Sequence, residues 1–555
     1  MFIEMWARLA WLMPGDRLRC WGLRAGLLFV VGLAVLAPLP PMAGNRFHHD
    51  EAVYSTWALD IASGRDIMVS GSPVDKPPLF MYLQALSFLL FGATETAARL
   101  PSLTAHVVSA LLMYRLGLRL YGRGAGLLAA FLWAASPFAI LFAATALTDS
   151  LMVMWVLAAC LAAVEQRASW AGVALGLAMM TKQQGILFLP LIAGLGWYHS
   201  KGAWKRFVLG LAWMVCLALI WDVARGRRPG FLEQSMLSYG SMHVPLEAVW
   251  PRLVGFATWL QYATGSALLN RVCLVGVAGL LLGDGVVWFL RRRGSGGMWA
   301  RPLRAGCPGS VAAEPGMVAR RAARTMGDAV RYDMVLGGFL LLFLVEHAFI
   351  GFQIWDRYML GAVALLLLLL ARVLVLPWRA LRAGCCARIS ESEEVIVPAA
   401  PPAWRAGITA LAVVYTVLVL VLLSGTLPAV RDAAASRFPV GGDHGAYDGI
   451  DQLAAYFKTV PENTTFYHRW LGPHWRFYLW GSPYDFRMWR SPEDLAAQAS
   501  ARPGARRYIV FPSWRSATEA RLALRQRGLV LREVFRTFRR DGSVSFIVYR
   551  IEETR

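Results

Sequence analysis

The chain has 555 residues, of which 57% are hydrophobic and only 16% charged, with a formal net charge of +21. A soluble globular protein carries about 25% charged residues, whereas this chain repeats apolar runs of roughly 17–25 residues that fit helices crossing a bilayer. The composition therefore excludes a soluble protein and predicts an integral membrane protein. The positive charge does not predict nucleic-acid binding, because the Arg residues cluster between apolar runs, as in cytoplasmic loops, and no recognised binding motif accompanies them.

The first apolar run, residues 25–40, follows an Arg-rich end and has no convincing cleavage site after it. We therefore expect an uncleaved span that starts in the cytoplasm and leaves the polar stretch 46–80 outside. Apolar residues recur at helical spacing over 50–61, which predicts a short helix along the membrane surface. The apolar stretch 79–91 is too short for a span and predicts a second interfacial helix.

Ten further spans follow in the sequence, and the basic loops between them fall on one side throughout. They are expected at residues 100–116, 124–146, 151–164, 170–180, 186–197, 207–223, 272–290, 334–352, 359–376 and 406–423. The interrupted apolar stretch 253–267 predicts an interfacial or re-entrant segment. The total of about eleven spans is odd, so the C-terminus should lie on the side opposite the cytoplasmic N-terminus.

Two domains are expected from a change in sequence character near residue 430. Residues 1–429 form the transmembrane module, with a polar first outer loop at 41–99. In residues 430–555, short apolar runs alternate with amphipathic stretches, which predicts a small soluble α/β domain outside the cytoplasm. The predicted class is a polytopic α-helical membrane protein with a C-terminal soluble domain.

This topology brings charged residues from separate loops to the outer face, although Arg counts in the loops alone determined the orientation. These residues are Asp50, Glu51, Lys76, Asp149, Lys182, His243 and Arg357. Acids and bases gathered beside a bilayer suit a substrate with a phosphate head and a lipid tail. Two residue-level alternatives stay open: Asp50 and Glu51 also fit a helix cap, and Lys182 also fits an interfacial residue whose ammonium reaches water.

The sequence motifs resemble one family. They are F-H-H-D-E-A-x-Y, G-x-D, K-P-P-L, F-G-x-x-E-x-x-A-R-L-P, L-T-D-S and M-T-K, in chain order. Over residues 25–250 this pattern resembles the GT-C superfamily of polyprenyl-phosphate-sugar-dependent glycosyltransferases, which includes the protein O-mannosyltransferases and the bacterial aminoarabinose transferases that modify lipid A. The Asp-Glu pair in the first outer loop is the most specific element of the resemblance.

The resemblance implies a GT-C fold and a set of site residues. It implies catalytic carboxylates at Asp50, which would be the base, at the neighbouring Glu51 and at Asp149. It implies contacts to the donor phosphate at Lys76, Arg357 and Tyr358, and the M-T-K motif adds Lys182. The chain has no long domain inserted between its middle spans, unlike the protein mannosyltransferases, and this departure argues against a protein acceptor.

The resulting hypothesis is a glycosyltransferase in the plasma (inner) membrane that moves a sugar from a polyprenyl-phosphate donor to a hydroxyl of a lipid, glycan or protein. A glycosidase needs two carboxyl groups because its leaving group is poor. A lipid phosphate leaves readily, so one base, Asp50, suffices for an inverting single displacement, and cations stabilise the phosphate. The expected partners are the lipid-linked donor, the acceptor and membrane lipids, without nucleic acid.

No cofactor is required by this chemistry, but a divalent metal (Zn, Mg or Mn) remains an open alternative. Asp75, His48 and His243 are the candidate ligands, because His and carboxylate suit zinc, although no close spacing joins them. Two other function classes also stay open. One is a transporter or flippase of a lipid-linked or anionic substrate, although transporters place charges in mid-span, and the other is a catalytically silent subunit with the same fold.

Overall fold

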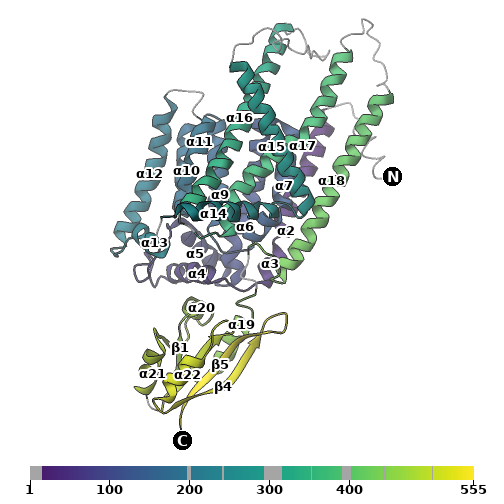
Figure 1. Ribbon diagram of the computed structural model, residues 1–555. Coiled ribbons are helices and arrows are strands. Elements are labelled where there is room, and N and C mark those ends of the chain that lie inside the picture. Colours follow the sequence, from purple (N-terminus) through teal and green to yellow (C-terminus); the bar gives the residue numbers. More distant parts are fainter. Residues whose placement is uncertain are drawn as a thin grey trace.

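The computed structural model describes residues 16–196, 202–239, 243–292, 315–351, 353–389, 402–441, 445–502 and 504–554. These residues form a helical bundle with a separate sheet domain at one end, which we call the domain end of the bundle (Figure 1). The elements of the bundle are α2 (Asp16–Leu36), α3 (Leu39–Gly44), α4 (His49–Ala62), α5 (Leu79–Phe91), α6 (Glu95–Tyr121), α7 (Arg123–Ala135), α8 (Pro137–Ala143), α9 (Asp149–Val164), α10 (Ala168–Thr181), η1 (Gln183–Phe188), α11 (Leu189–Gly196), α12 (Ala203–Ala224), α13 (Phe231–Tyr239), α14 (Leu246–Trp259), η2 (Leu260–Tyr262), α15 (Ala267–Arg292), α16 (Pro315–Phe349), η3 (Asp356–Met359), α17 (Leu360–Ile389) and α18 (Pro402–Ala434).

The bundle is that of a multi-pass membrane protein, but its predicted number of spans is not confirmed. Within the described residues, five helices are long and apolar enough to cross a membrane, or six if the pair α7 and α8, bent by 60°, counts as one. Several predicted spans are shorter helices, such as α9 with 16 residues and α10 with 14. Length and composition alone therefore fall short of the predicted total of about eleven.

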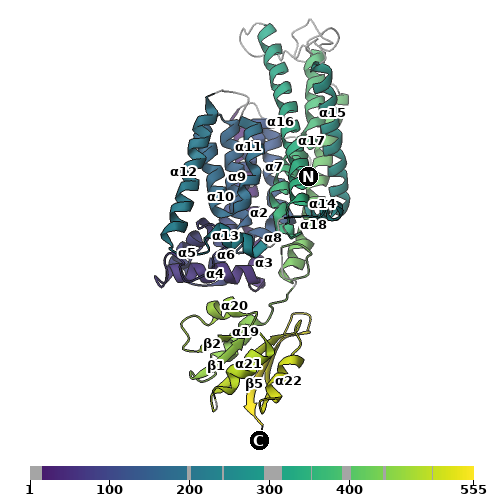
Figure 2. The ribbon, with the colours of Figure 1, turned by 60° about the vertical axis from the view of Figure 1, so that its left-hand side comes forward.

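The two short helices predicted after the first span are confirmed. α4 and α5 lie across the domain end of the bundle instead of along it (Figures 1 and 2). The last turns of α5 expose large apolar side chains, with Leu89, Leu90 and Phe91 each about two-thirds exposed. An apolar face of this kind suits a helix at the level of the lipid headgroups.

The C-terminal domain is an α/β unit, as predicted. Its elements are α19 (Ile450–Phe457), β1 (Thr464–His468), α20 (Gly472–Tyr478), β2 (Asp485–Met488), α21 (Pro492–Ser500), β3 (Arg506–Pro512), α22 (Thr518–Arg525), β4 (Leu529–Phe538) and β5 (Val544–Glu553). The strand order is β2-β1-β3-β5-β4. β1 pairs in parallel with β2 and β3, and β5 pairs antiparallel with β3 and β4. The predicted domain boundary at residue 430 lies inside α18, about one turn before that helix ends.

Two hydrophobic cores cover the two faces of this sheet. One core joins α19 and α20 to the sheet through Phe457 and Trp475, and the other joins α21 and α22 through Leu495 and Leu524. β1 leads into α20 on one face of the sheet, and its neighbour β3 leads into α22 on the other face. The connections therefore change faces between these two strands.

The short helix α20 attaches the domain to the first loop of the bundle. The ring Nε2 of His474 lies 3.1 Å from the carbonyl oxygen of Phe47, just before α4. The guanidinium of Arg476 bonds the buried carboxylate of Asp60 at 2.8 Å. These contacts fix the sheet domain directly beside the loop in which the sequence places its most specific motif.

Candidate functional site

The N-terminus of α4 is held by a capping box in which His48 is the N-cap residue. The backbone N–H of His48 donates to Oε2 of Glu51 at 2.9 Å, and the ring Nδ1 of His48 accepts the N–H of Asp50 at 3.2 Å. Reciprocal bonds of this kind satisfy the unpaired donors at a helix start. The cap therefore uses His48 and Glu51, which leaves the carboxylate of Asp50 available for another role.

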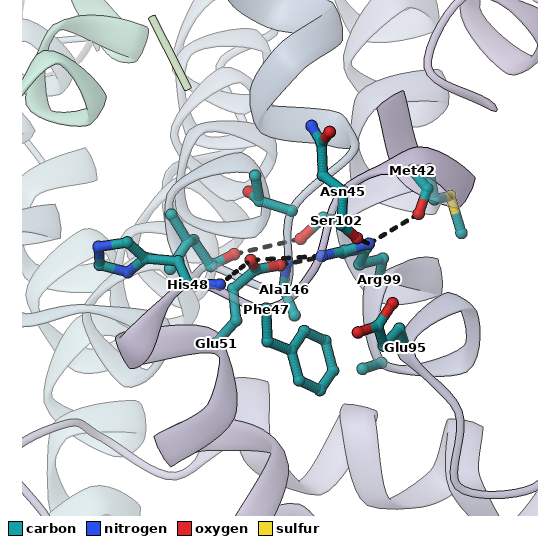
Figure 3. Close-up of polar contacts among 12 residues, drawn as sticks. Met42, Asn45, Phe47, His48, Glu51, Glu95, Arg99, Ser102 and Ala146 are labelled. Carbon is teal, nitrogen blue, oxygen red and sulfur yellow. Dashed lines mark hydrogen bonds and ion pairs between the residues drawn. The ribbon is translucent and has the colours of Figure 1, made fainter. Parts of the chain in front are cut away.

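Glu51 forms the centre of a buried ion pair with Arg99, in which the two side chains are 3% and 1% exposed (Figure 3). Nε of Arg99 donates to Glu51 Oε1 at 3.0 Å, and the N–H of Ala146 donates to the same oxygen at 2.7 Å. The other end of the guanidinium donates to the carbonyl oxygens of Met42 at 2.7 Å and Asn45 at 2.8 Å.

This pair ties four segments of the bundle together, namely α3, α4, α6 and the link between α8 and α9. Both oxygens of Glu51 already accept hydrogen bonds, which favours a positioning role for Glu51 over the catalytic role that the sequence predicts. Arg99 was missing from the predicted site residues. Its only sequence signal is its place in the F-G-x-x-E-x-x-A-R-L-P motif.

Asp50 forms an ion pair with Arg357, whose Nη1 lies 2.8 Å from Asp50 Oδ2. The Asp50 side chain is 29% exposed, and that of Arg357 is 12% exposed. Burial raises the pKa of Asp50, but the positive charge of Arg357, assisted by His48 and Lys76, outweighs burial and lowers this pKa to about 2. Asp50 is therefore ionised at every physiological pH.

A second acid–cation pair lies deeper, between Asp149 at the start of α9 and Lys182 in the break between α10 and η1. Lys182 Nζ lies 2.5 Å from Asp149 Oδ1, and both side chains are almost fully buried. Lys182 Nζ also lies 4.4 Å from the ring centroid of Tyr358, which is 2% exposed. The structure therefore brings Lys182 and Tyr358 together, and it buries Lys182 instead of leaving it at the lipid surface.

A third pair joins neighbouring residues just before α5, where Lys76 Nζ lies 2.6 Å from Asp75 Oδ2. The carbonyl oxygen of Asp75 accepts a 2.6 Å hydrogen bond from the side chain of Gln183, the residue after Lys182. Gln183 was not predicted from the sequence, and it connects the first loop to the break that carries Lys182.

The three pairs belong to one cluster at the domain end of the bundle. Its members are Asp50 with Arg357, Asp149 with Lys182, and Asp75 with Lys76. The cluster contains three carboxylates and three cations, so the formal charges of these six residues balance. A cavity of about 50 Å³ reaches the cluster at Arg357, and its lining also includes Arg46, His48, Glu51 and Asp356. An anionic ligand that enters here meets the guanidinium groups of Arg46 and Arg357.

The three residues suggested as metal ligands do not come together. Asp75 bonds Lys76, His48 caps α4, and His243 is an exposed residue. Within the described part of the chain, no group of three or more His, Cys, Asp or Glu side chains is arranged to hold a metal ion. The structure therefore does not form the predicted ligand set.

Known proteins resemble this chain over a shared segment and over the whole fold. Residues 75–224 match the family model described as dolichyl-phosphate-mannose-protein mannosyltransferase. An undecaprenyl phosphate-alpha-4-amino-4-deoxy-L-arabinose arabinosyl transferase of Sodalis glossinidius is 28% identical over 202 residues, or 33% of this chain and 36% of that protein. The putative mannosyltransferase YycA of Bacillus subtilis is 31% identical over 163 residues, or 27% and 24% of the two chains. These matches thus span about a third or less of the curated relatives.

The fold is similar to the solved structure of ArnT from Cupriavidus metallidurans in the apo state, with a TM-score of 0.57 and 17% sequence identity. The match covers 94% of this chain and 97% of the ArnT chain. The undecaprenyl phosphate-bound form of that ArnT matches 96% and 98%, with a TM-score of 0.53 and 16% identity. The chain has the GT-C fold. The resemblance predicted from the motifs is therefore confirmed, and the GT-C fold here includes the C-terminal domain. Both named relatives are sugar transferases, which supports an enzyme of that class.

The geometry of the Glu51–Arg99 pair predicts a stability defect when the pair is broken. Glu51→Gln leaves the buried Arg99 charge without its partner, a change that typically costs about 3–5 kcal/mol. We therefore expect a clearly lower melting temperature for Glu51→Gln in purified, detergent-solubilised protein.

Asp50→Asn is the matched control, because it changes the neighbouring acid in the same way at a partly exposed pair, where less stability is lost. A Glu51→Gln protein that melts at the wild-type temperature but has lost activity would contradict the positioning role and would indicate a catalytic role for Glu51.

Proposed function

We propose that this protein is an integral membrane glycosyltransferase that transfers a sugar from a polyprenyl-phosphate donor to a hydroxyl acceptor at the outer face of the plasma (inner) membrane. The observation that carries the proposal is the cluster of three cations around Asp50 at one end of a membrane bundle. The GT-C fold and the match to a mannosyltransferase family model support it.

The cations suit the phosphate of the donor. Arg357 offers a planar fork of N–H donors and Lys76 a compact ammonium, and both chemistries recognise phosphate. In the structure each of these cations bonds a carboxylate, so a phosphate oxygen would compete with that carboxylate for the cation. Lys182, which is fully buried against Asp149, would add its charge at longer range.

The same competition activates the base. While Arg357 is fully paired with it, Asp50 has a pKa of about 2 and is a weak proton acceptor. When the donor phosphate draws the guanidinium away, Asp50 loses its main stabilising charge, and its pKa rises toward the ordinary value of about 3.9. Donor binding would thus prepare Asp50 to take a proton from the acceptor.

The proposed reaction is a single displacement. The acceptor oxygen forms a bond to the anomeric carbon while the bond from that carbon to the phosphate oxygen breaks. The acceptor proton moves to Asp50, and the bonding electron pair leaves with the polyprenyl phosphate, whose charge Lys76 and Arg357 stabilise. Because attack and departure occur on opposite faces of the anomeric carbon, the configuration at that carbon inverts.

The proposed sidedness rests on the distribution of Arg residues. The basic loops lie between apolar runs on the side opposite the first loop, which is the distribution of cytoplasmic loops. The first loop and the C-terminal domain would then face outward. The alternative of a transporter finds no support in the comparisons. The assay of Asp50→Asn against wild type also tests this alternative, because a transporter should not release polyprenyl phosphate.

The first functional prediction concerns Asp50→Asn. Asn keeps the size of Asp but cannot accept the acceptor proton, so the transfer rate should fall about 10²–10⁴-fold, the usual contribution of a general base. The measurement is sugar transfer and polyprenyl-phosphate release by purified protein over a panel of polyprenyl-phosphate sugars. Binding of undecaprenyl phosphate should be at least as tight as in wild type, because Asn carries no charge that competes with the phosphate for Arg357, and this binding serves as the folding control. A folded Asp50→Asn protein with near-normal transfer would remove Asp50 as the base.

The second functional prediction concerns Lys76 and the donor phosphate. Lys76→Ala should weaken donor binding more than Lys76→Arg does, because the phosphate needs a charge here more than it needs a bidentate geometry. The measurement is the Kd for undecaprenyl phosphate in protein reconstituted into nanodiscs. If Lys76→Ala binds the lipid as tightly as wild type, Lys76 does not contact the phosphate.

A further inference from the structure

Each of the three parallel strands of the C-terminal sheet is followed by a tryptophan next to an arginine. The pairs are Arg469-Trp470 after β1, Trp489-Arg490 after β2 and Trp514-Arg515 after β3. In open α/β sheets, ligands bind outside the carboxyl ends of the strands, at the point where the chain changes from one face of the sheet to the other. β1 and β3 are neighbours that lead to opposite faces, so the pairs gather at the switch point of this sheet.

The side chains at this edge are in mutual contact. The guanidinium of Arg469 lies 5.2 Å from the ring centroid of Trp489 and 5.6 Å from that of Trp470. Arg515 lies 5.5 Å from the ring of Trp470, which connects the end of β1 to the end of β3. Arg469 and Arg515 are exposed, and within the described residues neither has a carboxylate partner. Both are therefore available to an anion.

The edge also has features of a built site. Trp489 is 3% exposed, and its indole Nε1 has no hydrogen-bond partner in the described part of the chain. A buried indole N–H normally finds a partner, so this donor is an unsatisfied polar group beneath the guanidinium of Arg469. Trp514 is 41% exposed, so its ring offers an apolar face to a ligand.

An aromatic band leads from this edge to the candidate catalytic residue. Trp514 lies 5.6 Å from Tyr447, and Tyr447 stacks on His474 at 4.4 Å. His474 lies 6.1 Å from His49, the residue before Asp50. Burial lowers the pKa of His474 to about 3 and also lowers that of His49, so both imidazoles are neutral near pH 7. Because His474 is fully buried, the band is a packed, uncharged aromatic connection between two charged sites.

We propose that the carboxyl edge of the C-terminal sheet binds an anionic saccharide, and that this saccharide is part of the acceptor. The inference rests on the proposed function and names its acceptor class. A tryptophan offers a broad apolar face with an N–H at its edge. A sugar ring matches that surface, because its C–H bonds form an apolar face and its hydroxyl groups lie at the rim. The exposed guanidinium groups add forked donors that suit a carboxylate or phosphate on the sugar.

The aromatic band gives the bound glycan a direction. A chain of sugar rings bound at Trp514 can continue past the half-buried Tyr447, which packs on the buried His474, and its end then points toward the region of Asp50. The contacts of α20 with the first loop hold this path in place. The sheet domain would therefore act as the acceptor-binding part of the enzyme.

Direct binding to the full-length protein in nanodiscs tests this proposal. The probes are fluorescent tetragalacturonate, which carries carboxylates, fluorescent pentamannosyl phosphate, and neutral mannopentaose. We expect at least one anionic probe to bind more tightly than the neutral one, and the preferred probe identifies the anionic group. The double change Arg469→Gln with Arg515→Gln should weaken that binding about tenfold or more, since it removes two charge-assisted contacts, and Trp514→Ala should weaken it as well.

Arg527→Gln is the matched control, because Arg527 is an exposed arginine of the same domain that lies just before β4, away from the carboxyl ends of β1 and β3. It should leave glycan binding unchanged, and all variants should keep the wild-type melting temperature and affinity for undecaprenyl phosphate. Neutral and anionic probes that bind equally, no binding of any probe, or equal losses in Arg527→Gln and the double variant would each overturn the proposal. Failure of donor binding or of the Asp50→Asn test would instead count against the proposed function, so the two failures are distinguishable.

Discussion

The buried ion pair between Glu51 and Arg99 is the interaction on which the arrangement of the site depends. Its hydrogen bonds join α3, α4, α6 and the link before α9, so the first loop cannot shift without breaking them. A buried pair of this kind contributes less to net stability than to geometry, because desolvation offsets most of the attraction. Here the geometry orients the start of α4, with Asp50 directed toward Arg357.

The site itself consists of charges that satisfy one another until a ligand arrives. Arg357 holds the pKa of Asp50 low, and Lys76 and Lys182 each hold a neighbouring carboxylate. In a site built in this way the acids and cations balance one another's charge, and the cations also suit a phosphate. In the proposed transfer, the same exchange that binds the donor also frees the base, so binding and activation are linked through one guanidinium.

Much of this arrangement could be predicted from the sequence, and the exceptions have physical reasons. Helical spacing gave the bounds of α4 within one residue, and the apolar run at residues 79–91 gave those of α5. Loop charges placed Asp50, Asp149 and Arg357 on one side. The partner of Glu51 could not be predicted, because Arg99 lies 48 residues away in the chain and a sequence pattern does not reveal which charges pair. The predicted number of spans is not confirmed, because several of the predicted spans are short helices or a bent pair, for which helix length alone does not decide whether the membrane is crossed.

The central claim is that the cation cluster around Asp50 holds a lipid phosphate. The most direct test is a cryo-EM structure of the protein in lipid nanodiscs with undecaprenyl phosphate bound. We predict a phosphate within hydrogen-bond distance of Lys76 and Arg357, about 2.7–3.2 Å, with the Arg357–Asp50 contact lengthened or lost. A phosphate bound at another place, or bound here with that ion pair intact and Lys76 still on Asp75, would show that these cations do not hold the lipid phosphate.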